Sequence, residues 1–498
     1  MSRSEPDPVD VLIVGAGLSG IGAAVHLQQR CPDRRFAIVE ARDRLGGTWD
    51  LFRYPGIRSD SDMYTMGYRF APWPDAKAIA DGASILAYLQ ATAREHGVDR
   101  HIRYGQRVTE ASWSTADACW TVQLEAADGS RHRLRAGFLL MCPGYYRYDR
   151  GHRAALPGIE RFAGRVVHPQ FWPQDLDTAG QRIVIVGSGA TAVTLLPALA
   201  QTAAHVTMLQ RSPTWIVSRP SVDRLAEALR RWLPAGAAYT LNRWKRVLLG
   251  MYFYRLCRRK PQGVGRWLLE QLKPQLPPGF DIERHFHPRY NPWEQRLCLV
   301  PDGDFFRAIR EGRASVATDT IETFTERGIR LASGEELPAN VVVTATGLEL
   351  QVLGGAQLVV DGRPVDPAQC VSYKAMMLSG VPNLASITGY TNASWTLKAD
   401  LSAEYVCRLL NHLRRRGLRQ CTPTLTDPDM PLADAFDFSS GYIRRALHLF
   451  PKRGMKAPWL LKQNYIHDLL TLRHGRIDDG ALVFSSPAAP QGALAAAE

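Results

Sequence analysis

The sequence predicts an α/β fold with two separate β-α-β units and a helical insert. Two near-continuous apolar runs, VDVLIV at 9–14 and RIVIV at 182–186, are typical of buried parallel strands. A glycine-rich turn and a helical pattern follow each run. Residues 221–278 are basic and rich in Leu, Trp and Tyr without the alternation of a strand, which favours helices. Short strands return between residues 314 and 346.

The size and composition are those of a multidomain globular protein. The chain has 498 residues, more than one hydrophobic core accommodates, so two or three domains are expected. No apolar run reaches the roughly 18 residues of a membrane span, and the polar N-terminus MSRSEPDPVD lacks the apolar core of a secretory signal. We therefore expect a cytoplasmic protein.

The eight cysteines are scattered and form no C-x-x-C pair. In a cytoplasmic chain this pattern predicts free, buried thiols. It supports neither a zinc site nor any other metal site, and it argues against a dithiol reductase.

The first β-α-β unit carries a complete dinucleotide-binding fingerprint. The turn after its first strand reads G-x-G-x-x-G at 15–20, a helix is expected through about Gln29, and the next strand, 36–40, ends in Glu40. Gly15 permits a tight turn, Gly17 lets the backbone approach a pyrophosphate, and Gly20 lets helix and strand pack closely. Glu40 can accept hydrogen bonds from ribose hydroxyls, so this unit is predicted to bind FAD.

The second unit has the related pattern G-x-G-x-x-A at 187–192, a helix through Ala200, and a strand that ends in Arg211 and Ser212. An acid at the end of this strand would repel a 2′-phosphate, whereas an arginine binds one bidentately. The second unit is therefore predicted to bind NADPH. The alternative is that Arg211 is a solvated strand end.

Two Rossmann-like dinucleotide-binding domains in one chain imply that electrons pass from NADPH to a flavin. We expect the FAD-binding domain at 1–150 and 346–484, and the NADPH-binding domain at 151–222 and 285–345. The helical insert is expected at 223–284, and the low-complexity end, 485–498, is expected to be a disordered tail.

Two longer motifs resemble the signatures of a known enzyme family. One is F-x-G-x-x-x-H-x-x-x-W-P, from Phe162 to Pro173, and the other is G-G-x-W-x-x-x-x-Y-P-G-x-x-x-D, from Gly46 to Asp60. Both are similar to the signatures of type I Baeyer–Villiger monooxygenases, and the resemblance covers nearly the whole chain. Four further strings resemble the ethionamide-activating branch of that family: GSGATAVTLLPALA, HPRYNPWEQRLCLVPDGDFF, VTATG and GYTNASWTLKADL.

The resemblance implies a reaction and two residues that serve it. In that family NADPH reduces FAD, O₂ adds to give a C4a-peroxyflavin, and one oxygen atom is inserted next to a ketone carbonyl, giving an ester or a lactone. By motif position Arg296 stabilises the developing negative charge, because a guanidinium stays charged at any working pH. Asp60 is implied to orient that arginine. The alternatives are a surface ion pair for Arg296 and a helix N-cap for Asp60, which we favour over Asp62 as the site residue.

The resemblance also implies cofactor contacts. Thr48 and Trp49 match positions beside the flavin, and Trp395 resembles a further one. Arg58 and Ser59, with Asp60, match positions near the nicotinamide. The fingerprint histidine, His168, lies outside the chemistry in that family. The residues expected to contact FAD or NADPH are Gly15, Gly17, Ser19, Gly20, Glu40, Gly47, Thr48, Trp49, Asp50, Leu51, Arg58, Ser59, Asp60, Val108, Gly187, Ser188, Gly189, Ala190, Thr191, Ala192, Val193, Arg211 and Ser212.

The main alternative is a flavin-containing S- or N-oxygenase, which would oxidise lipophilic soft nucleophiles without needing Arg296. Trp172 and Pro173 argue against it, because those enzymes share the first signature without this ending. The branch resembled here oxidises sulfides as well as ketones, so the expected partners are a small ketone or sulfide and O₂. The intact glycine turns argue against a non-enzymatic flavoprotein sensor.

The net charge of +13 is partly local, since residues 240–260 hold seven basic residues and no acidic one. One interpretation is a helix packed on its neighbours, and the other is peripheral contact with an anionic membrane. No nucleic-acid-binding fold accompanies this charge, so no nucleic-acid partner is expected. The apolar residues of the segment that fall at helical spacing are Trp244, Val247, Leu248, Met251 and Tyr252.

Overall fold

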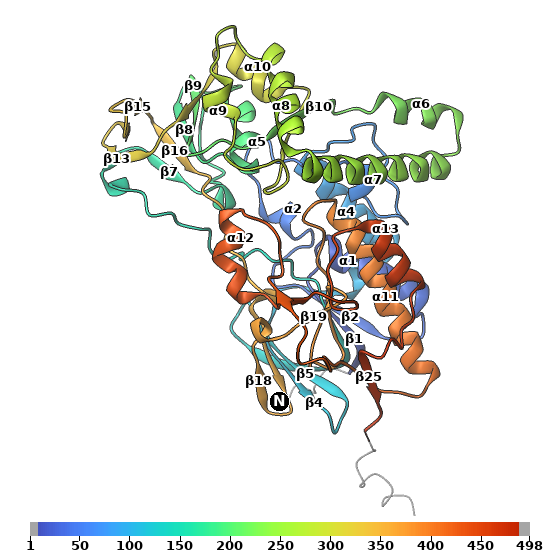
Figure 1. Ribbon diagram of the computed structural model, residues 1–498. Helices are drawn as coiled ribbons and strands as arrows, with labels where there is room; N and C mark the ends of the chain where they lie inside the picture. Colours follow the sequence, from blue (N-terminus) through green and yellow to red (C-terminus); the bar gives the residue numbers. More distant parts are fainter. Residues whose placement is uncertain (1–7, 488–498) are drawn as a thin grey trace, which may run out of the picture.

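The computed structural model describes residues 8–487 and has two lobes, each built on its own sheet (Figure 1). In the lower lobe the strand order is β18-β17-β4-β5-β6-β1-β2-β3, and β21 also pairs with β6. The strands are β1 (Val9–Val14), β2 (Phe36–Val39), β3 (Ile102–Arg103), β4 (Gln106–Ser114), β5 (Cys119–Ala126), β6 (Arg131–Met141), β17 (Gln357–Val360), β18 (Arg363–Val365) and β21 (Leu384–Ser386).

Helices from both ends of the chain pack together on the lower lobe. Helix α1 (Leu18–Arg30) follows the first glycine turn, and α11 (Trp395–Arg415) packs against it. β1 is buried from Val11 onward and pairs in parallel with both β2 and β6, as its near-continuous apolar run predicts. The other helices are α2 (Thr48–Leu51), α3 (Met63–Met66), α4 (Gly82–Glu95), α12 (Gly441–Ala446) and α13 (Tyr465–Asp468).

The upper lobe holds a five-stranded parallel sheet in the order β12-β9-β8-β16-β7. An antiparallel meander, β13-β14-β15, stands beside it. The strands are β7 (Arg165–Val167), β8 (Arg182–Val186), β9 (His205–Gln210), β12 (Ala314–Thr318), β13 (Ile321–Thr325), β14 (Gly328–Leu331), β15 (Glu336–Pro338) and β16 (Val341–Thr344), and the helices are α5 (Ala190–Leu199), α9 (Ile282–Phe286) and α10 (Asp304–Arg310).

The predicted helical insert consists of α6 (Arg224–Trp232), α7 (Ala235–Arg259) and α8 (Pro261–Leu272). The N-cap of α6 is Asp223, whose carboxylate accepts hydrogen bonds from two N–H groups of the first turn. α7 contacts both lobes, because Tyr239 and Val247 pack in the core of the lower lobe and Cys257 packs in that of the upper lobe (Figure 1). No helix within residues 8–487 is both long and apolar enough to cross a membrane.

Four small two-stranded sheets complete the structure. They pair β10 (Ile216–Arg219) with β11 (Cys298–Pro301), β19 (Ser372–Tyr373) with β20 (Met377–Leu378), β22 (Gln420–Pro423) with β25 (Leu482–Ser485), and β23 (Leu432–Ala433) with β24 (Arg453–Gly454).

The predicted fold class is confirmed, with α/β architecture, two nucleotide-type sheets and a helical insert. All eight cysteines are free thiols, seven of them buried, as expected. The predicted start of the disordered tail is wrong by at least one residue, because Ser485 pairs with Gln420 in the β22–β25 ladder. Residues 488–498 of that prediction lie outside the described range.

Candidate functional site

A cleft of about 760 Å³ is lined by both lobes. The first glycine turn and the carboxyl end of β2 line it, as do the start of α5 and the loop before β11. It brings together fifteen of the residues predicted from the sequence, namely Gly15, Gly17, Ser19, Glu40, Gly47, Thr48, Trp49, Arg58, Ser59, Asp60, Val108, Ala190, Thr191, Arg296 and Trp395.

The first glycine turn is as tight as its motif predicts. Gly15 has a φ of +103°, and a Cβ there would lie 2.5 Å from the Cys142 carbonyl oxygen. A Cβ on Gly20 would lie 1.9 Å from the Gly15 carbonyl oxygen, so this glycine serves helix packing and does not line the cleft. Gly17 faces Gly47, whose own Cβ would lie 3.0 Å from the Gly17 Cα. Side chains at these positions would fill the space that a pyrophosphate needs.

Glu40, predicted as the last residue of its strand, directly follows β2 and has a buried carboxylate. One oxygen accepts from the Ala16 N–H at 2.7 Å and the other from the Arg42 N–H at 3.0 Å. Burial raises the pKa of Glu40 despite these bonds. The carboxylate therefore closes the glycine turn and still lines the cleft.

The second glycine turn opens α5 at the opposite wall. Gly187 has a φ of +142°, and a Cβ there would lie 2.3 Å from the Ala345 carbonyl oxygen. Nothing lies within 4 Å of a Cβ built on Gly189, so the space over this turn is open. The side chains of Ala192 and Val193, by contrast, pack in the core of the upper lobe.

Arg211 and Ser212 lie exposed after β9 and do not line the cleft. Arg211 forms no ion pair with any described residue, so its guanidinium is available to a ligand. Gly187, Ser188 and Gly189 are likewise outside the cleft lining.

Arg296 and Asp60 form an ion pair in the lining of the cleft. The Arg296 Nε lies 2.9 Å from the Asp60 Oδ2, and 35% and 28% of the two side chains are open to the cleft. The Asp60 carboxylate raises the pKa of Arg296 above its already high ordinary value. The N-cap of α3 is Asp62, which accepts from the Thr65 N–H, so the N-cap alternative for Asp60 is wrong.

Three tyrosines that the sequence analysis missed surround Arg296. Tyr145 and Tyr146 follow β6, with their hydroxyl oxygens 3.3 Å apart, and Tyr442 lies in α12. Burial raises the pKa of all three phenols, so they remain neutral hydrogen-bond donors. The string YYRY after a buried strand was a usable signal, because ligands lie at the carboxyl ends of parallel strands.

A smaller apolar pocket adjoins the cleft at Arg296. Tyr145, Tyr390 and Trp395 line both spaces. Two threonines, Thr388 and Thr391, also line the pocket. The rest of the lining is mainly apolar, and its large side chains are Leu350, Phe436, Phe438, Tyr442, Ile443 and Phe450.

Trp395, which lines both the pocket and the cleft, also contacts the first glycine turn. Its Nε1 donates to the Ser19 Oγ at 2.8 Å, and its ring lies 5.2 Å from that of Tyr145, centroid to centroid. A Cβ on Gly389 would lie 2.4 Å from the Trp395 ring. A glycine is therefore needed where the indole crosses the backbone.

Two predicted contacts have other partners. Asp50 does not line the cleft, because its buried carboxylate pairs with Arg42 at 2.5 Å and Arg53 at 2.8 Å. Arg58 does line it, yet its guanidinium pairs with Asp304 at the start of α10, which joins the two lobes. Leu51 lies outside the cleft lining.

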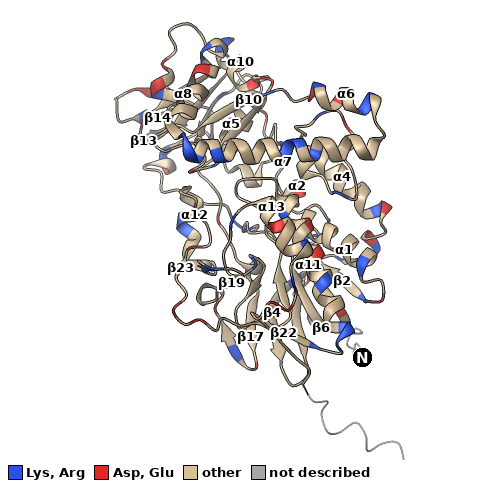
Figure 2. Cartoon of the chain, turned by 45° about the vertical axis from the view of Figure 1, so that its right-hand side comes forward, with Lys and Arg blue, Asp and Glu red and all other residues tan. Residues whose placement is uncertain are grey.

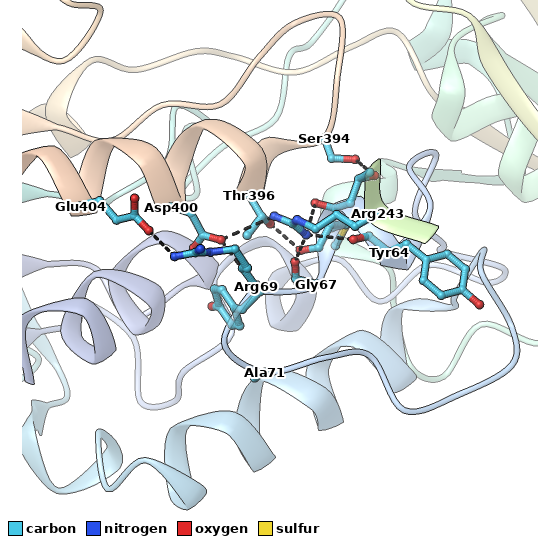
Figure 3. A network of polar contacts seen from close by, with 12 residues as sticks. Tyr64, Gly67, Arg69, Ala71, Arg243, Ser394, Thr396, Asp400 and Glu404 are labelled. Carbon is cyan, nitrogen blue, oxygen red and sulfur yellow. Dashed lines mark hydrogen bonds and ion pairs between the residues drawn. The ribbon is translucent and has the colours of Figure 1, made fainter. Parts of the chain in front are cut away.

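The segment that follows Asp60 is held by a buried arginine from the insert (Figure 3). The Arg243 Nη1 lies 2.8 Å from the carbonyl oxygens of both Tyr64 and Gly67, and its Nη2 lies 3.6 Å from Asp400 of α11. Burial opposes ionisation of Asp400, but the His26 hydrogen bond and the charges of His26 and Arg243 outweigh it and lower the Asp400 pKa. α7 thus fixes the backbone that leads away from the Arg296–Asp60 pair.

His168 lies outside the cleft lining. Its Nδ1 accepts from the Gln170 N–H at 3.2 Å, and burial lowers its pKa. It packs against Gly151, where a Cβ would lie 2.2 Å from the imidazole. The contacts are those of a structural histidine between the lobes.

Comparison with known proteins now adds the family. Residues 10–225 match the family described as flavin-binding monooxygenase-like. The chain is 54% identical over 485 residues to the FAD-containing monooxygenase EthA of Mycobacterium tuberculosis, which covers 97% of this chain and 99% of the relative. This chain belongs to the FAD-containing monooxygenases. It is also 47% identical to the probable FAD-binding monooxygenase AlmA of Acinetobacter baylyi, over 96% of each chain.

Solved structures place this monooxygenase in the same fold. An oxidised steroid monooxygenase bound to NADP superposes with a TM-score of 0.70 at 22% identity, over 84% of this chain and 88% of that one. OTEMO in complex with FAD and NADP gives a TM-score of 0.73 at 18% identity, over 97% and 100%. The predicted flavin monooxygenase class is confirmed, and the predicted cofactors agree with these proteins.

Proposed function

We propose that this monooxygenase is an FAD- and NADPH-dependent Baeyer–Villiger enzyme that converts a ketone to an ester or lactone and also oxidises sulfides. The observation that carries the proposal is the Arg296–Asp60 ion pair of 2.9 Å, in which Arg296 lines both the cleft and the apolar pocket. An electrophilic S- or N-oxygenation has no need for such a pair, whereas attack on a carbonyl develops negative charge on oxygen.

The residues of the cleft fit FAD. The Gly17–Gly47 contact leaves room for a pyrophosphate, and Glu40 stands at the strand end where a ribose is expected. Thr48, Trp49 and Trp395 would hold the ring end near Arg296. The volume lies within the roughly 300–1,000 Å³ range of small-molecule sites.

The upper lobe fits NADPH. The open space over Gly189 suits its pyrophosphate, and the exposed Arg211 and Ser212 suit its 2′-phosphate. Tyr54 and Thr191 lie beside each other in the cleft lining. Burial raises the pKa of Tyr54 to about 12. When bound, NADPH would supply the electrons and FAD would activate O₂, which is the source of the inserted oxygen atom.

The protein side chains then have separate tasks. Arg296 presents a permanent positive charge to the carbonyl oxygen as it becomes negative, and Asp60 holds the guanidinium in one orientation. Tyr145 and Tyr442 are neutral donors nearby. The aromatic pocket excludes water from an apolar substrate and strengthens these electrostatic effects.

A substrate panel tests the proposal. NADPH consumption is measured with cyclic, linear and aryl ketones and with sulfides, and each product is identified by mass spectrometry. Esters or lactones carrying one ¹⁸O atom from ¹⁸O₂ are the expected result. Sulfoxides from the sulfides, with no ester from any ketone, would instead establish an S-oxygenase and overturn the Baeyer–Villiger assignment.

A further inference from the structure

The outward face of α7 exposes a line of large apolar side chains. Leu241, Leu248 and Tyr252 are separated by seven and four residues, so they lie on one side of the helix. Leu248 is 50% exposed and Tyr252 is 66% exposed, and Leu249 beside them is also exposed. The opposite side, with Tyr239 among others, is buried against the lower lobe.

α6 continues this face on one side of α7. Its N-cap, Asp223, binds Lys245 and Arg246 of α7 and so holds the two helices together. The outward residues of α6 are Leu225 and Trp232, which are seven residues apart and therefore on one helix face. Trp232 is 85% exposed, an unusual position for so large an apolar side chain.

α13 borders α7 on its other side, where the rings of Trp244 and Tyr465 lie 5.8 Å apart. Figures 1 and 2 both show α7 between α6 and α13, with its outward face uncovered. Large exposed apolar side chains gathered on two adjacent helices are typical of a binding surface.

The charged residues of α7 itself are all of one sign, whereas α6 carries Glu227 and begins after its N-cap, Asp223. α7 has no acidic residue, and in Figure 2 its ribbon carries the blue of Lys and Arg and no red. Four of the seven basic residues at 240–260 are paired with acids from other elements. The other three are exposed at the C-terminal end of α7 and form no ion pair with described residues: Arg255, Arg259 and Lys260.

We propose that this surface, the α6–α7 face, docks on the anionic surface of a lipid membrane. We define the face by Leu225, Trp232, Leu241, Leu248, Leu249, Tyr252, Arg255, Arg259 and Lys260.

The chemistry of the face suits a lipid surface. Leucines enter the acyl boundary, Trp and Tyr suit the headgroup level, and the basic residues attract anionic lipid. A second copy of the chain is a poorer occupant, because a symmetric contact would bring the same unpaired cations together. Membrane binding does not depend on the reaction, although it would bring the enzyme to lipophilic substrates of the kind proposed above.

Vesicle sedimentation of the FAD-loaded full chain tests the proposal. We expect the protein to sediment with vesicles of phosphatidylcholine mixed with phosphatidylglycerol at low salt, and to remain in solution with phosphatidylcholine alone. Each basic residue near an anionic surface contributes about fivefold in affinity. Arg255→Glu with Arg259→Glu should therefore weaken binding by at least about 25-fold. Leu248→Ser with Tyr252→Ser should weaken it without changing its salt dependence.

Matched variants away from the face serve as controls. Leu432→Ser with Val483→Ser removes two apolar side chains of similar exposure, 49% and 51%, from β23 and β25. Arg133→Glu with Arg330→Glu makes the same change in net charge at two other exposed positions. Both control pairs should bind vesicles as the native chain does.

Three results would overturn the proposal. They are no sedimentation of the native chain with anionic vesicles, an equal loss of binding in the control pairs, and native self-association that only the α6–α7 variants abolish. Turnover of a water-soluble substrate is measured in parallel and should be unchanged in every variant. A failure of membrane docking is thereby distinguished from a failure of the proposed reaction.

Discussion

Replacing Arg296 with alanine separates the oxygen-transfer step from the reduction of the flavin. A fixed donor placed where negative charge develops contributes about 100- to 1,000-fold in rate, or about 2.7–4 kcal/mol. The change also leaves the Asp60 carboxylate without its partner at 2.9 Å, and this anion opposes the developing negative charge. We therefore expect ester formation to fall by about 1,000-fold or more.

The fold should survive this replacement. With 35% and 28% of the two side chains open to the cleft, the Arg296–Asp60 pair contributes at most about 1 kcal/mol to stability. Reduction of the flavin by NADPH, followed without oxygen as the loss of its visible absorbance, should stay within a few-fold of native. With oxygen, the electrons should leave as hydrogen peroxide instead of entering an ester.

A matched control is Arg165→Ala, which removes an arginine from the exposed pair with Asp175 outside the cleft. Its ester formation should equal that of the native enzyme. Native ester formation by Arg296→Ala would refute the assigned role. Loss of flavin reduction together with ester formation would also refute it, because the residue would then serve cofactor binding.

Four other changes have defined outcomes. Asp60→Asn should lower ester formation about 10- to 100-fold, because a charge-assisted hydrogen bond to Arg296 is lost, and product analysis at saturating NADPH measures this. Arg211→Ala should raise the KM for NADPH about 10- to 100-fold and leave that for NADH unchanged in steady-state kinetics; equal effects on both would show that Arg211 does not bind the 2′-phosphate. Arg243→Met leaves the buried Asp400 charge without its arginine, so the free energy of unfolding should fall by about 3–5 kcal/mol. For a chain of this size the Tm, measured by thermal unfolding, should then fall by roughly 3–5 °C. Because Asp60 raises the pKa of Arg296, the arginine keeps its proton as the pH rises. The rate of ester formation should therefore not fall up to about pH 10 through loss of this proton. In Arg296→Lys the rate should fall as the pH approaches the usual lysine pKa of about 10.4.

Local sequence patterns were sufficient to predict the framework. The first helix ends at Arg30 where Gln29 was expected, and β9 ends at Gln210 where Arg211 was expected. Apolar runs, glycine turns and helix periodicity act over a few residues, so they are visible in the sequence. Gly15 and Gly187 are needed for positive φ and for close approach to a neighbouring carbonyl oxygen.

The walls of the site could not be predicted in this way. Tyr145 and Tyr442 are far apart in the sequence and meet at Arg296 only because α12 folds back beside the end of β6. Asp50 lies in the Gly46–Asp60 signature, yet its carboxylate pairs with Arg42 and Arg53 and does not line the cleft. Such pairings depend on tertiary packing, and no local periodicity encodes them.

The connectivity of the lower lobe has a consequence for the order in which the chain acquires its shape during synthesis. β21 must pair with β6, and Trp395 must reach Ser19, before the first nucleotide fold is complete. The strands of the smaller sheet all lie between residues 165 and 344. Because synthesis starts at the N-terminus, the second nucleotide fold can form before α11, which the first fold needs, has been synthesised. The nucleotide fold that begins the sequence is thus the last to complete its folding. Until then its unpaired strand edges need protection from aggregation.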